Sequence, residues 1–352
     1  MKSLGSAAAA LGLAIAVWLV WRDHPAAILA LLREAGGGLL LAAAAHLLPM
    51  LANAADWRLL IRRAPRPGFG AMLRLVLIRE SVNGLLPVAR IGGEIVAYRL
   101  LRRLRVKHAT AIASLVVDMQ LTLVSQLVFA LLAVGWLLEH STSDTSRLVG
   151  RLAASIALAA PVLLLFALVQ HARPFERATQ LLNRVTSGQF VAQLGASAGV
   201  DRCMMLLWRN TGVVARYLLI WQTLQFLGFS LEIWLALLAL GAHPSVADAL
   251  VIEALIQLLS SVAFLVPGSL GVQEGGFVLI GGLLGLDPPV CLALAGARRL
   301  RDLLFYLPGL AVWQLAEHRP ARVSRRRPGP VNRRRRPGAP LASPAGRAAA
   351  AR

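Results

Sequence analysis

Long hydrophobic runs, separated by short polar segments rich in arginine, recur along most of this 352-residue chain. A helix needs about 20 apolar residues to cross about 30 Å of hydrocarbon, and several runs reach that length. The first run follows Lys2 like a signal peptide, but it is long and lacks a clear cleavage site, which indicates a retained anchor. The pattern predicts helical crossings at residues 4–21, 38–57, 109–138, 152–171, 213–240 and 288–316.

Two further hydrophobic segments, at residues 70–105 and 247–287, are interrupted by proline, glycine and charge. The first contains SVNGLLPVARIGGE (81–94), and the second contains SVAFLVPGSLGVQE (261–274). Proline breaks a helix, and irregular backbone inside lipid is tolerated only where protein buries it or where it lines a water-filled cavity. Each segment is therefore predicted to form two half-helices that meet at membrane depth.

Arginine and lysine in the short loops predict the orientation, because cytoplasmic loops carry an excess of both. Residues 58–67 hold four arginines, and residues 99–107 hold four arginines and one lysine. Both loops are therefore expected in the cytoplasm. The segment between them then enters and leaves the membrane on the same side, so it is predicted to be re-entrant.

The remaining loops predict that the second broken segment enters from the opposite side. Residues 139–151 mix both charges and residues 241–246 lack arginine and lysine, which suits the outer face. The loop 172–211 is rich in arginine and therefore cytoplasmic, and its scattered apolar residues predict amphipathic helices on the membrane surface or a small packing layer. With both termini in the cytoplasm, the path closes only if 247–287 is re-entrant from outside.

The two broken segments also resemble each other. Aligned without gaps, they share five of fourteen residues, including the pairs Pro87/Pro267 and Glu94/Glu274. Opposed topology with a shared motif is typical of the inverted repeats of secondary transporters. We therefore predict an all-α polytopic membrane protein within residues 1–318, with about six full spans and two opposed re-entrant helical hairpins arranged as an inverted repeat.

Composition agrees with a membrane protein, since 57% of the residues are hydrophobic and the mean hydropathy is +0.65. The net charge of +20 is uneven, because residues 319–352 contain eleven arginines, six prolines and no acidic residue. Such a tail cannot bury a core, so we expect a disordered cytoplasmic segment that enforces topology or attracts anionic lipid headgroups. Nucleic-acid binding is not expected, because no folded reader accompanies the charge.

Charged residues inside the broken segments are candidates for function, because a charge at membrane depth costs about 2.5–3.5 kcal/mol on insertion scales. Glu94 and Glu274 either line a cavity or simply occupy the first turn of a half-helix, where the helix dipole favours them by about 0.3–1 kcal/mol. The larger cost favours cavity lining. Neighbouring glycines permit tight turns there.

Arginine suits a lipid phosphate because its planar fork donates two hydrogen bonds at once. Arg90 in the first hairpin and Arg298, Arg299 and Arg301 in the last span are therefore candidates to bind a phosphate or to pair with carboxylates. Arg298 also lies four residues before Asp302, the spacing of an ion pair within one helix. The candidate lipid-cavity residues are Asn83, Pro87, Arg90, Gly92, Glu94, Asp118, Pro267, Ser269, Gly271, Glu274, Arg298, Arg299 and Asp302.

No pattern of a catalytic or metal site occurs in the sequence. HExxH, CxxC, Walker-loop and GxSxG motifs are missing, and Cys203 and Cys291 have neither disulfide nor metal spacing. The seven histidines are dispersed and lie mostly at predicted span ends, where an interfacial role is expected. We predict no enzyme activity, no cofactor and no metal.

At these motifs the chain resembles the flippase-like transmembrane region of the lysylphosphatidylglycerol synthase family, over most of residues 1–318. The ending LPGLAVWQLAE (307–317) looks most like the branch associated with hopanoid biosynthesis. The resemblance is carried by NGLLPVARIGGEIVAYRLL (83–101), ASLVVDMQLTLVSQ (113–126), FLVPGSLGVQEGGFVLIGGLLGL (264–286) and RRLRDLLFYLPGL (298–310). Many relatives have an arginine where Met119 stands, so the resemblance leaves the charge pairing of Asp118 open.

This resemblance implies a flippase or lipid carrier that moves a polar or hopanoid-type lipid across or within the bacterial cytoplasmic membrane, with an oligomer possible. Synthase activity is not expected, because full-length synthases have a soluble aminoacyl-transfer domain where this chain has its basic tail. The alternatives are a non-transporting membrane scaffold for lipid-modifying enzymes and a membrane-embedded lipid transferase. The resemblance places six residues in two re-entrant elements around a lipid cavity: Pro87, Gly92, Glu94, Pro267, Gly271 and Glu274.

Overall fold

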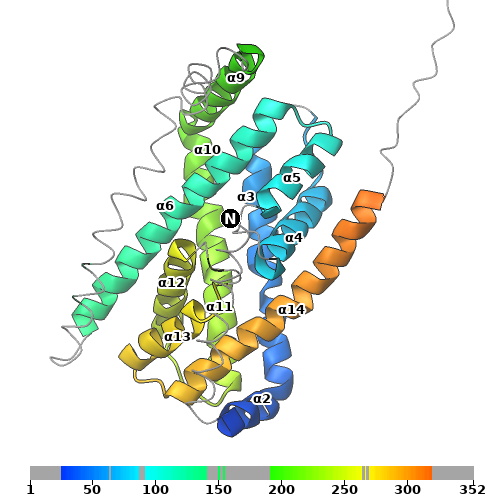
Figure 1. Cartoon of the computed structure of the whole chain (residues 1–352). Coiled ribbons are helices and arrows are strands. Elements are labelled where there is room, and N and C mark those ends of the chain that lie inside the picture. Colours follow the sequence, from blue (N-terminus) through cyan, green and yellow to red (C-terminus); the bar gives the residue numbers. More distant parts are fainter. Residues whose placement is uncertain are drawn as a thin grey trace, which may run out of the picture. The chain divides into compact units, whose positions relative to one another are not determined.

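The structure, a computed structural model, describes residues 25–62, 65–86, 92–140, 191–263 and 269–318 and the single residues 150, 154 and 266 (Figure 1). This part of the chain is helical and contains no strand, which confirms the all-α prediction. The predicted crossing at 4–21, nearly all of the one at 152–171, and the tail lie outside the described residues.

The elements of the described part are eleven α-helices and one π-helix, η2. Their bounds are α2 (Pro25–Ala45), α3 (Leu47–Leu60), α4 (Phe69–Leu85), α5 (Gly92–Arg103), α6 (His108–His140), α9 (Val191–Trp208), α10 (Thr211–Arg216), η2 (Tyr217–Gln222), α11 (Thr223–Ala239), α12 (Val246–Val262), α13 (Val272–Leu283) and α14 (Pro288–His318).

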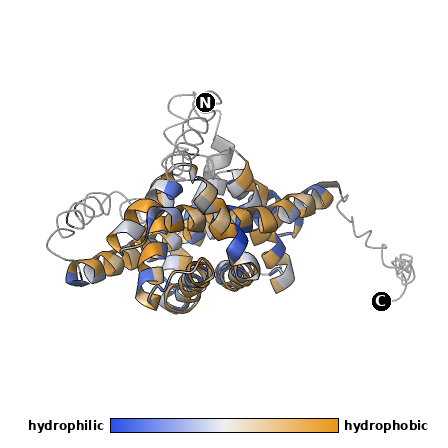
Figure 2. Ribbon diagram, turned by 90° about the horizontal axis from the view of Figure 1, so that it is seen from below, coloured by the Kyte–Doolittle hydropathy of each residue, from blue (hydrophilic) through white to orange (hydrophobic). Residues whose placement is uncertain are grey.

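Three stretches of the described residues are long and apolar enough to cross a membrane. They are Leu29–Leu60, His108–His140 and Thr211–Ala239, and they lie at three of the predicted crossings. Hydrophobic residues cover most of the described ribbon (Figure 2). α14 forms at a fourth predicted crossing and has 31 residues, but three arginines and an aspartate in its middle lower its hydropathy.

Two of these stretches are not single α-helices, which corrects the prediction of continuous helices there. His46 separates α2 from α3, and Gly36 inside α2 has a φ of 40°, which only glycine adopts without strain. Between α10 and α11 the chain winds into the π-helix η2. Single π turns inside α-helices occur frequently at functional sites.

Each broken segment forms a helical hairpin that is followed by a long helix. The first succession, α4, α5 and α6, has 17, 12 and 33 residues, and the second, α12, α13 and α14, has 17, 12 and 31. Gly92 and Val272 begin the second helices and His108 and Pro288 begin the long helices, and each pair is 180 residues apart.

The turn between hairpin and long helix is also the same in both successions. Arg105 and Gly285 are left-handed there, with φ of 63° and 77°. The N–H of the following residue donates to the carbonyl five positions earlier, at 3.1 Å after Arg105 and 2.9 Å after Gly285. This is the Schellman pattern of a helix end.

The start of α12 is capped by Ser245 and Asp248. Ser245 Oγ accepts from Asp248 N at 3.1 Å, and the Asp248 side chain accepts from Ser245 N at 2.8 Å.

The long helix of each succession packs against the first helix of the other hairpin, α14 along α4 and α6 along α12 (Figure 1). Gly84 of α4 meets the ring of Tyr306, since an added Cβ would lie 2.6 Å from that ring. Ser261 of α12 donates to Gln126 of α6 at 2.7 Å. Gln126 and Tyr306 are again 180 residues apart in the chain. Each hairpin is therefore in contact with the long helix that follows the other hairpin.

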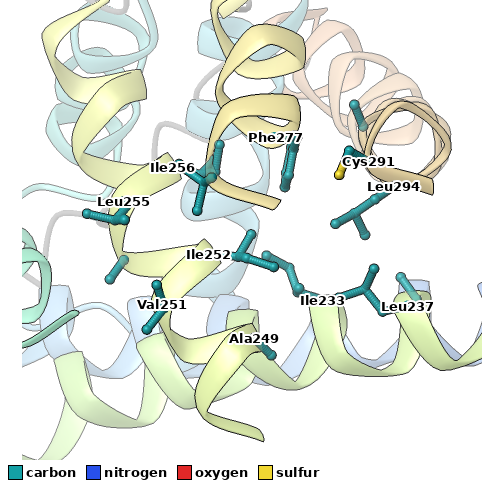
Figure 3. Packing of buried hydrophobic residues seen from close by; sticks show 14 of the residues in the cluster. Ile233, Leu237, Ala249, Val251, Ile252, Leu255, Ile256, Phe277, Cys291 and Leu294 are labelled. Carbon is teal, nitrogen blue, oxygen red and sulfur yellow. The ribbon is translucent and has the colours of Figure 1, made fainter. Parts of the chain in front are cut away.

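The described residues bury two hydrophobic cores, one around each hairpin. The core of the second hairpin gathers Ile233 of α11, Ile252 and Ile256 of α12, Phe277 of α13 and Leu294 of α14 (Figure 3). The interdigitation of branched side chains from four helices removes a large apolar area from solvent. It also holds the polar residues of the same helices in fixed positions.

The core of the first hairpin extends to α9. Val200, Met204 and Leu207 of α9 are buried in this core, and the helix packs against α6. Trp208 donates to Gln120 of α6 at 3.2 Å. Within the described part of the predicted loop 172–211, α9 therefore packs on the first core and on α6.

Candidate functional site

Arg79 of α4 lies at the centre of a buried polar network in the first half of the chain. Its Nη1 lies 2.7 Å from Asp118 Oδ2 on α6, and its Nη2 donates to Asn53 Oδ1 on α3 at 3.0 Å. The guanidinium lies over Trp57, 4.6 Å from the ring centroid. Because Arg79 is only 5% exposed, the carboxylate and the ring replace the water that the charge has lost. Asp118 thus has an arginine partner although Met119 follows it.

Glu94, the third residue of α5, lies at the edge of the same network. Its Oε1 is 3.9 Å from Arg79 Nε, and Glu80 Oε1 is 3.5 Å from the same nitrogen. Beside it the Gly93 N–H donates to Asn83 Oδ1 at 2.9 Å, which joins the two helices of the hairpin. A Cβ on Gly93 would lie 2.5 Å from the Arg79 carbonyl oxygen, so this close approach requires glycine.

The π-helix η2 connects Asp118 with a second buried aspartate. Tyr217 donates its hydroxyl hydrogen to Asp118 Oδ1 at 2.8 Å, and Gln222 donates to Asp56 Oδ2 on α3 at 2.9 Å. Gln225 of α11 donates to the same oxygen of Asp56. Asp56 and Tyr217 are both 0% exposed. The first network therefore joins α3, α4, α5, α6, η2 and α11.

Glu274, the third residue of α13, belongs to a second network. Its Oε2 accepts from the Gly271 N–H at 2.7 Å and so caps the helix, and Gly271 has a φ of 75°. Its Oε1 accepts from Arg299 of α14 through Nε at 3.1 Å and Nη2 at 3.0 Å. Arg299 Nη1 is also 3.9 Å from Asp302. Glu274 therefore combines a helix-start role with an ion pair to α14.

Arg298 forms a bidentate pair with Glu253 of α12. Its Nη1 and Nη2 donate to the two carboxylate oxygens at 2.8 and 3.4 Å. Glu253 is completely buried, and the guanidinium lies 5.9 Å from the centroid of Phe277. The predicted pair of Arg298 with Asp302 is therefore wrong, because Arg298 reaches across to α12 instead.

Arg301 meets the break between α2 and α3. Its Nη1 donates to Glu232 of α11 at 3.1 Å, and its Nη2 is 3.1 Å from Asp302. His46, at the break itself, lies 3.0 Å from Glu232 through Nδ1 and also contacts the Arg301 guanidinium. Phe305 packs edge-on against the imidazole with 5.0 Å between ring centroids. His46 is thus part of a buried network, and it lies inside the predicted crossing 38–57 and not at one of its ends.

A small pocket of about 20 Å³, which is room for about one water molecule, lies beside the second network. Its polar lining consists of Glu232, Arg298 and Arg301. Guanidinium groups at an apolar surface can donate hydrogen bonds to a phosphate while the surrounding walls contact hydrocarbon. The apolar lining comes from α2, α11, α13 and α14 through Leu39, Ala42, Ala43, Ile233, Ala236, Phe277, Leu294 and Ala297. In the part of the chain that the structure describes, no group of three His, Cys, Asp or Glu residues is placed to hold a metal ion.

A family model described as the lysylphosphatidylglycerol synthase TM region matches residues 9–309 of this chain. The chain belongs to this family. No curated protein and no solved structure matches the sequence. Membership of the lysylphosphatidylglycerol synthase TM family, together with the apolar helices, identifies a membrane protein with a lipid-related role.

In this member of the family, the candidates from the sequence fall into both networks. Asn83, Glu94 and Asp118 belong to the first network. Gly92 begins α5, and Ser269 lies at the break before α13 with a φ of 51°. Pro87, Arg90 and Pro267 lie outside the described residues. The candidates in the second network are Gly271, Glu274, Arg298, Arg299 and Asp302.

Several buried network residues of this family member were not among the candidates, namely His46, Asp56, Arg79, Tyr217, Gln222, Gln225, Glu232 and Glu253. Asp56 carried a usable signal, because it is the one acidic residue of the predicted crossing at 38–57. Tyr217 and Gln222 carried no such signal. Their pairing depends on the π turn, which no hydrophobic periodicity reveals.

Proposed function

We propose that this protein moves a polar or hopanoid-type lipid across or within the bacterial cytoplasmic membrane, as a flippase or lipid carrier with both termini in the cytoplasm. Family membership supports the lipid and the membrane parts of this proposal. Aminoacyl transfer is not part of the proposed activity. Oligomerisation and contact of the basic tail with anionic headgroups are compatible with it.

The crosswise packing of the two successions supports an inverted repeat of two re-entrant hairpins. α4, α5 and α6 correspond to α12, α13 and α14 in length, in helix starts and in the connecting turn. Transporters with inverted repeats place substrate at the interface between the repeats, near broken helices. In the proposed repeat this interface would include α14, which contacts α4 and also lines a pocket with Arg298 and Arg301.

The observation that carries the proposal is the pocket at Glu232, Arg298 and Arg301. Its arginines face walls of alanine, leucine and phenylalanine, so a single site offers guanidinium groups and hydrocarbon contacts together. An amphipathic lipid with an anionic headgroup needs both. Glu232 and Glu253 hold these arginines at present, and a phosphate would take the place of one carboxylate. Exchange of this kind would keep the arginine paired, and the displaced carboxylate would take up a proton to stay neutral in the buried site.

Lipid exchange between the leaflets of reconstituted vesicles tests this proposal. Purified protein in vesicles that contain fluorescent phosphatidylglycerol should speed the loss of signal when a membrane-impermeant quencher is added, and Arg301→Gln should abolish the gain. Arg74→Gln, at an exposed position of α4, is the matched control and should behave as wild type. If the folded protein moves neither this probe nor a labelled hopanoid between leaflets, the transport proposal is overturned and the scaffold alternative is favoured.

A further inference from the structure

The π turn at residues 217–222 brings two side chains onto the same face that an α-helix would separate. Tyr217 and Gln222 lie five residues apart, which corresponds to the i→i+5 repeat of a π-helix. Gln222 Nε2 lies 3.4 Å from the Tyr217 hydroxyl oxygen. In addition, Thr223 Oγ1 donates to the Leu218 carbonyl at 3.3 Å, also five positions earlier. The turn thus forms a polar bridge inside the first hydrophobic core.

This bridge connects two aspartates from different helices. Tyr217 donates to Asp118 of α6 at 2.8 Å, while Gln222 donates to Asp56 of α3 at 2.9 Å. A continuous path of hydrogen bonds therefore runs from Asp56 through the π turn to Asp118 and on to Arg79. Every member of this path is at most 5% exposed.

The four carboxylate oxygens of this pair are not equally satisfied. Both oxygens of Asp118 accept charge-assisted or hydroxyl hydrogen bonds, from Arg79 and Tyr217. Asp56 Oδ2 accepts from Gln222 and Gln225. Asp56 Oδ1 is buried and has no hydrogen-bond partner. None of the ion pairs among the described residues includes Asp56, whereas Arg79 is shared by three other carboxylates.

We infer that Asp56 is a proton-binding site, with the proton on the unpartnered Oδ1 and the neutral carboxyl held in place by the π turn. An ionised carboxylate that is buried without a cation is less stable than a neutral carboxyl group that lacks one hydrogen bond. Repulsion from Asp118 adds to the cost of the charged form, because two nearby carboxylates resist ionising together. The neutral form is therefore the stable form.

A proton fits this position better than a metal cation does. A cation needs several oxygen ligands at once, and three of the four oxygens already accept from N–H or O–H groups that point hydrogen atoms at them. The amide NH₂ groups of Gln222 and Gln225 would repel a cation near Asp56 Oδ2. A proton needs only the free oxygen.

The charged and titratable groups around Asp56 come from each helix that packs on α3. α6 contributes the carboxylate of Asp118, α4 contributes the guanidinium of Arg79, and η2 contributes the hydroxyl of Tyr217. α11 contributes the neutral Gln225 here. The other charged residues of α2 and α11 do not reach this site: Arg33 and Glu34 are exposed, and Glu232 pairs with Arg301.

Binding and release of the proton at Asp56 would couple lipid movement to a proton gradient. This coupling rests on the proposed function, whereas the proton site itself does not. Release would leave two buried carboxylates, Asp56 on α3 and Asp118 on α6, whose repulsion would act to separate these helices. The site could then alternate between two arrangements of the first hairpin.

Infrared difference spectroscopy of the full chain in lipid nanodiscs tests the site without any transport assay. At neutral pH, wild-type protein should show a carboxylic acid C=O band that shifts in heavy water, and Asp56→Asn, an isosteric change, should lose it. Glu139→Gln, a change to an exposed carboxylate near the end of α6, is the control and should keep the band. Tyr217→Phe should move its frequency, because the bridge is broken. Thermal unfolding of each variant establishes that the fold is kept.

Each outcome decides one part of the inference. A band that persists in Asp56→Asn, or no band in wild type, would overturn the proton site. A band that appears only after sodium is removed would assign the site to sodium instead.

Once the site is established, vesicles with and without a pH gradient test the coupling. Exchange that the gradient accelerates in wild type but not in Asp56→Asn supports coupling, whereas equal acceleration in both overturns it. Absence of exchange in wild type would count against the proposed transport and leave the spectroscopic result intact.

Discussion

Arg79 Nη1 lies 2.7 Å from Asp118 Oδ2, and this ion pair joins the first helix of one hairpin to the long helix that follows it. Arg79 is also within ion-pair distance of Glu80 and Glu94. One guanidinium therefore faces three carboxylates inside a buried region. Its removal should affect more than one contact.

Arg79→Gln should strongly destabilise the protein. The amide can still donate to Asn53, but Asp118 and Glu94 lose their cation, and breaking a buried ion pair costs about 3–5 kcal/mol. Thermal unfolding in detergent measures the change. Arg74→Gln on the same helix is the control, because Arg74 is exposed and surface changes stay within about 0.5 kcal/mol. A loss of similar size in both variants would contradict a special role for Arg79.

Gly93→Ala should separate the two helices of the first hairpin. The added Cβ would lie 2.5 Å from the Arg79 carbonyl oxygen and 2.6 Å from the Asn83 side chain, and overpacking costs about 1–3 kcal/mol. The matched control is Gly275→Ala on α13, where nothing lies within 4 Å of the added Cβ. That change should be neutral or stabilising by about 0.5–1 kcal/mol, since alanine favours a helix. Urea or heat unfolding of both variants in nanodiscs distinguishes them.

The sequence predicted the positions of the hairpins because proline and glycine in an apolar run have few structural explanations. α4 and α12, the first helices of the two hairpins, begin within one residue of the predicted starts at 70 and 247. Glu94 and Glu274 were found by the cost of a charge in lipid. That argument applies to a single residue and needs no knowledge of its neighbours.

The partners of these charges could not be predicted from the sequence. Arg298 is four residues from Asp302, yet it pairs with Glu253, which is 45 residues away and on another helix. Spacing along one helix shows which pairs can form, whereas tertiary packing decides which pair does form. The partners of His46 could not be predicted for the same reason, because Glu232 and Arg301 are distant in the chain.

The two free cysteines should report on folding. Cys291 is 1% exposed in the second core, whereas Cys203 of α9 is partly exposed. A soluble maleimide should therefore label one site per chain in the native protein and two after denaturation, because a buried thiol is inaccessible to reagent. Mass spectrometry of labelled peptides identifies the sites. Rapid native labelling of Cys291 would contradict the packing of α13 against α14.

A double-mutant cycle on Arg298 and Glu253 should show strong coupling. Arg298→Met leaves Glu253 charged and buried, and Glu253→Gln leaves Arg298 charged, so each single change should cost about 3–5 kcal/mol. The double variant has no uncompensated charge, and its glutamine can still accept from Gln257, which donates to Glu253 at 2.6 Å. Its loss should therefore be smaller than the sum of the single losses by at least about 1 kcal/mol. The free energies of unfolding of the four proteins, measured in one detergent, give the coupling. Additive losses would mean that the pair contributes no specific stability, and that the two residues act through separate contacts in the second core.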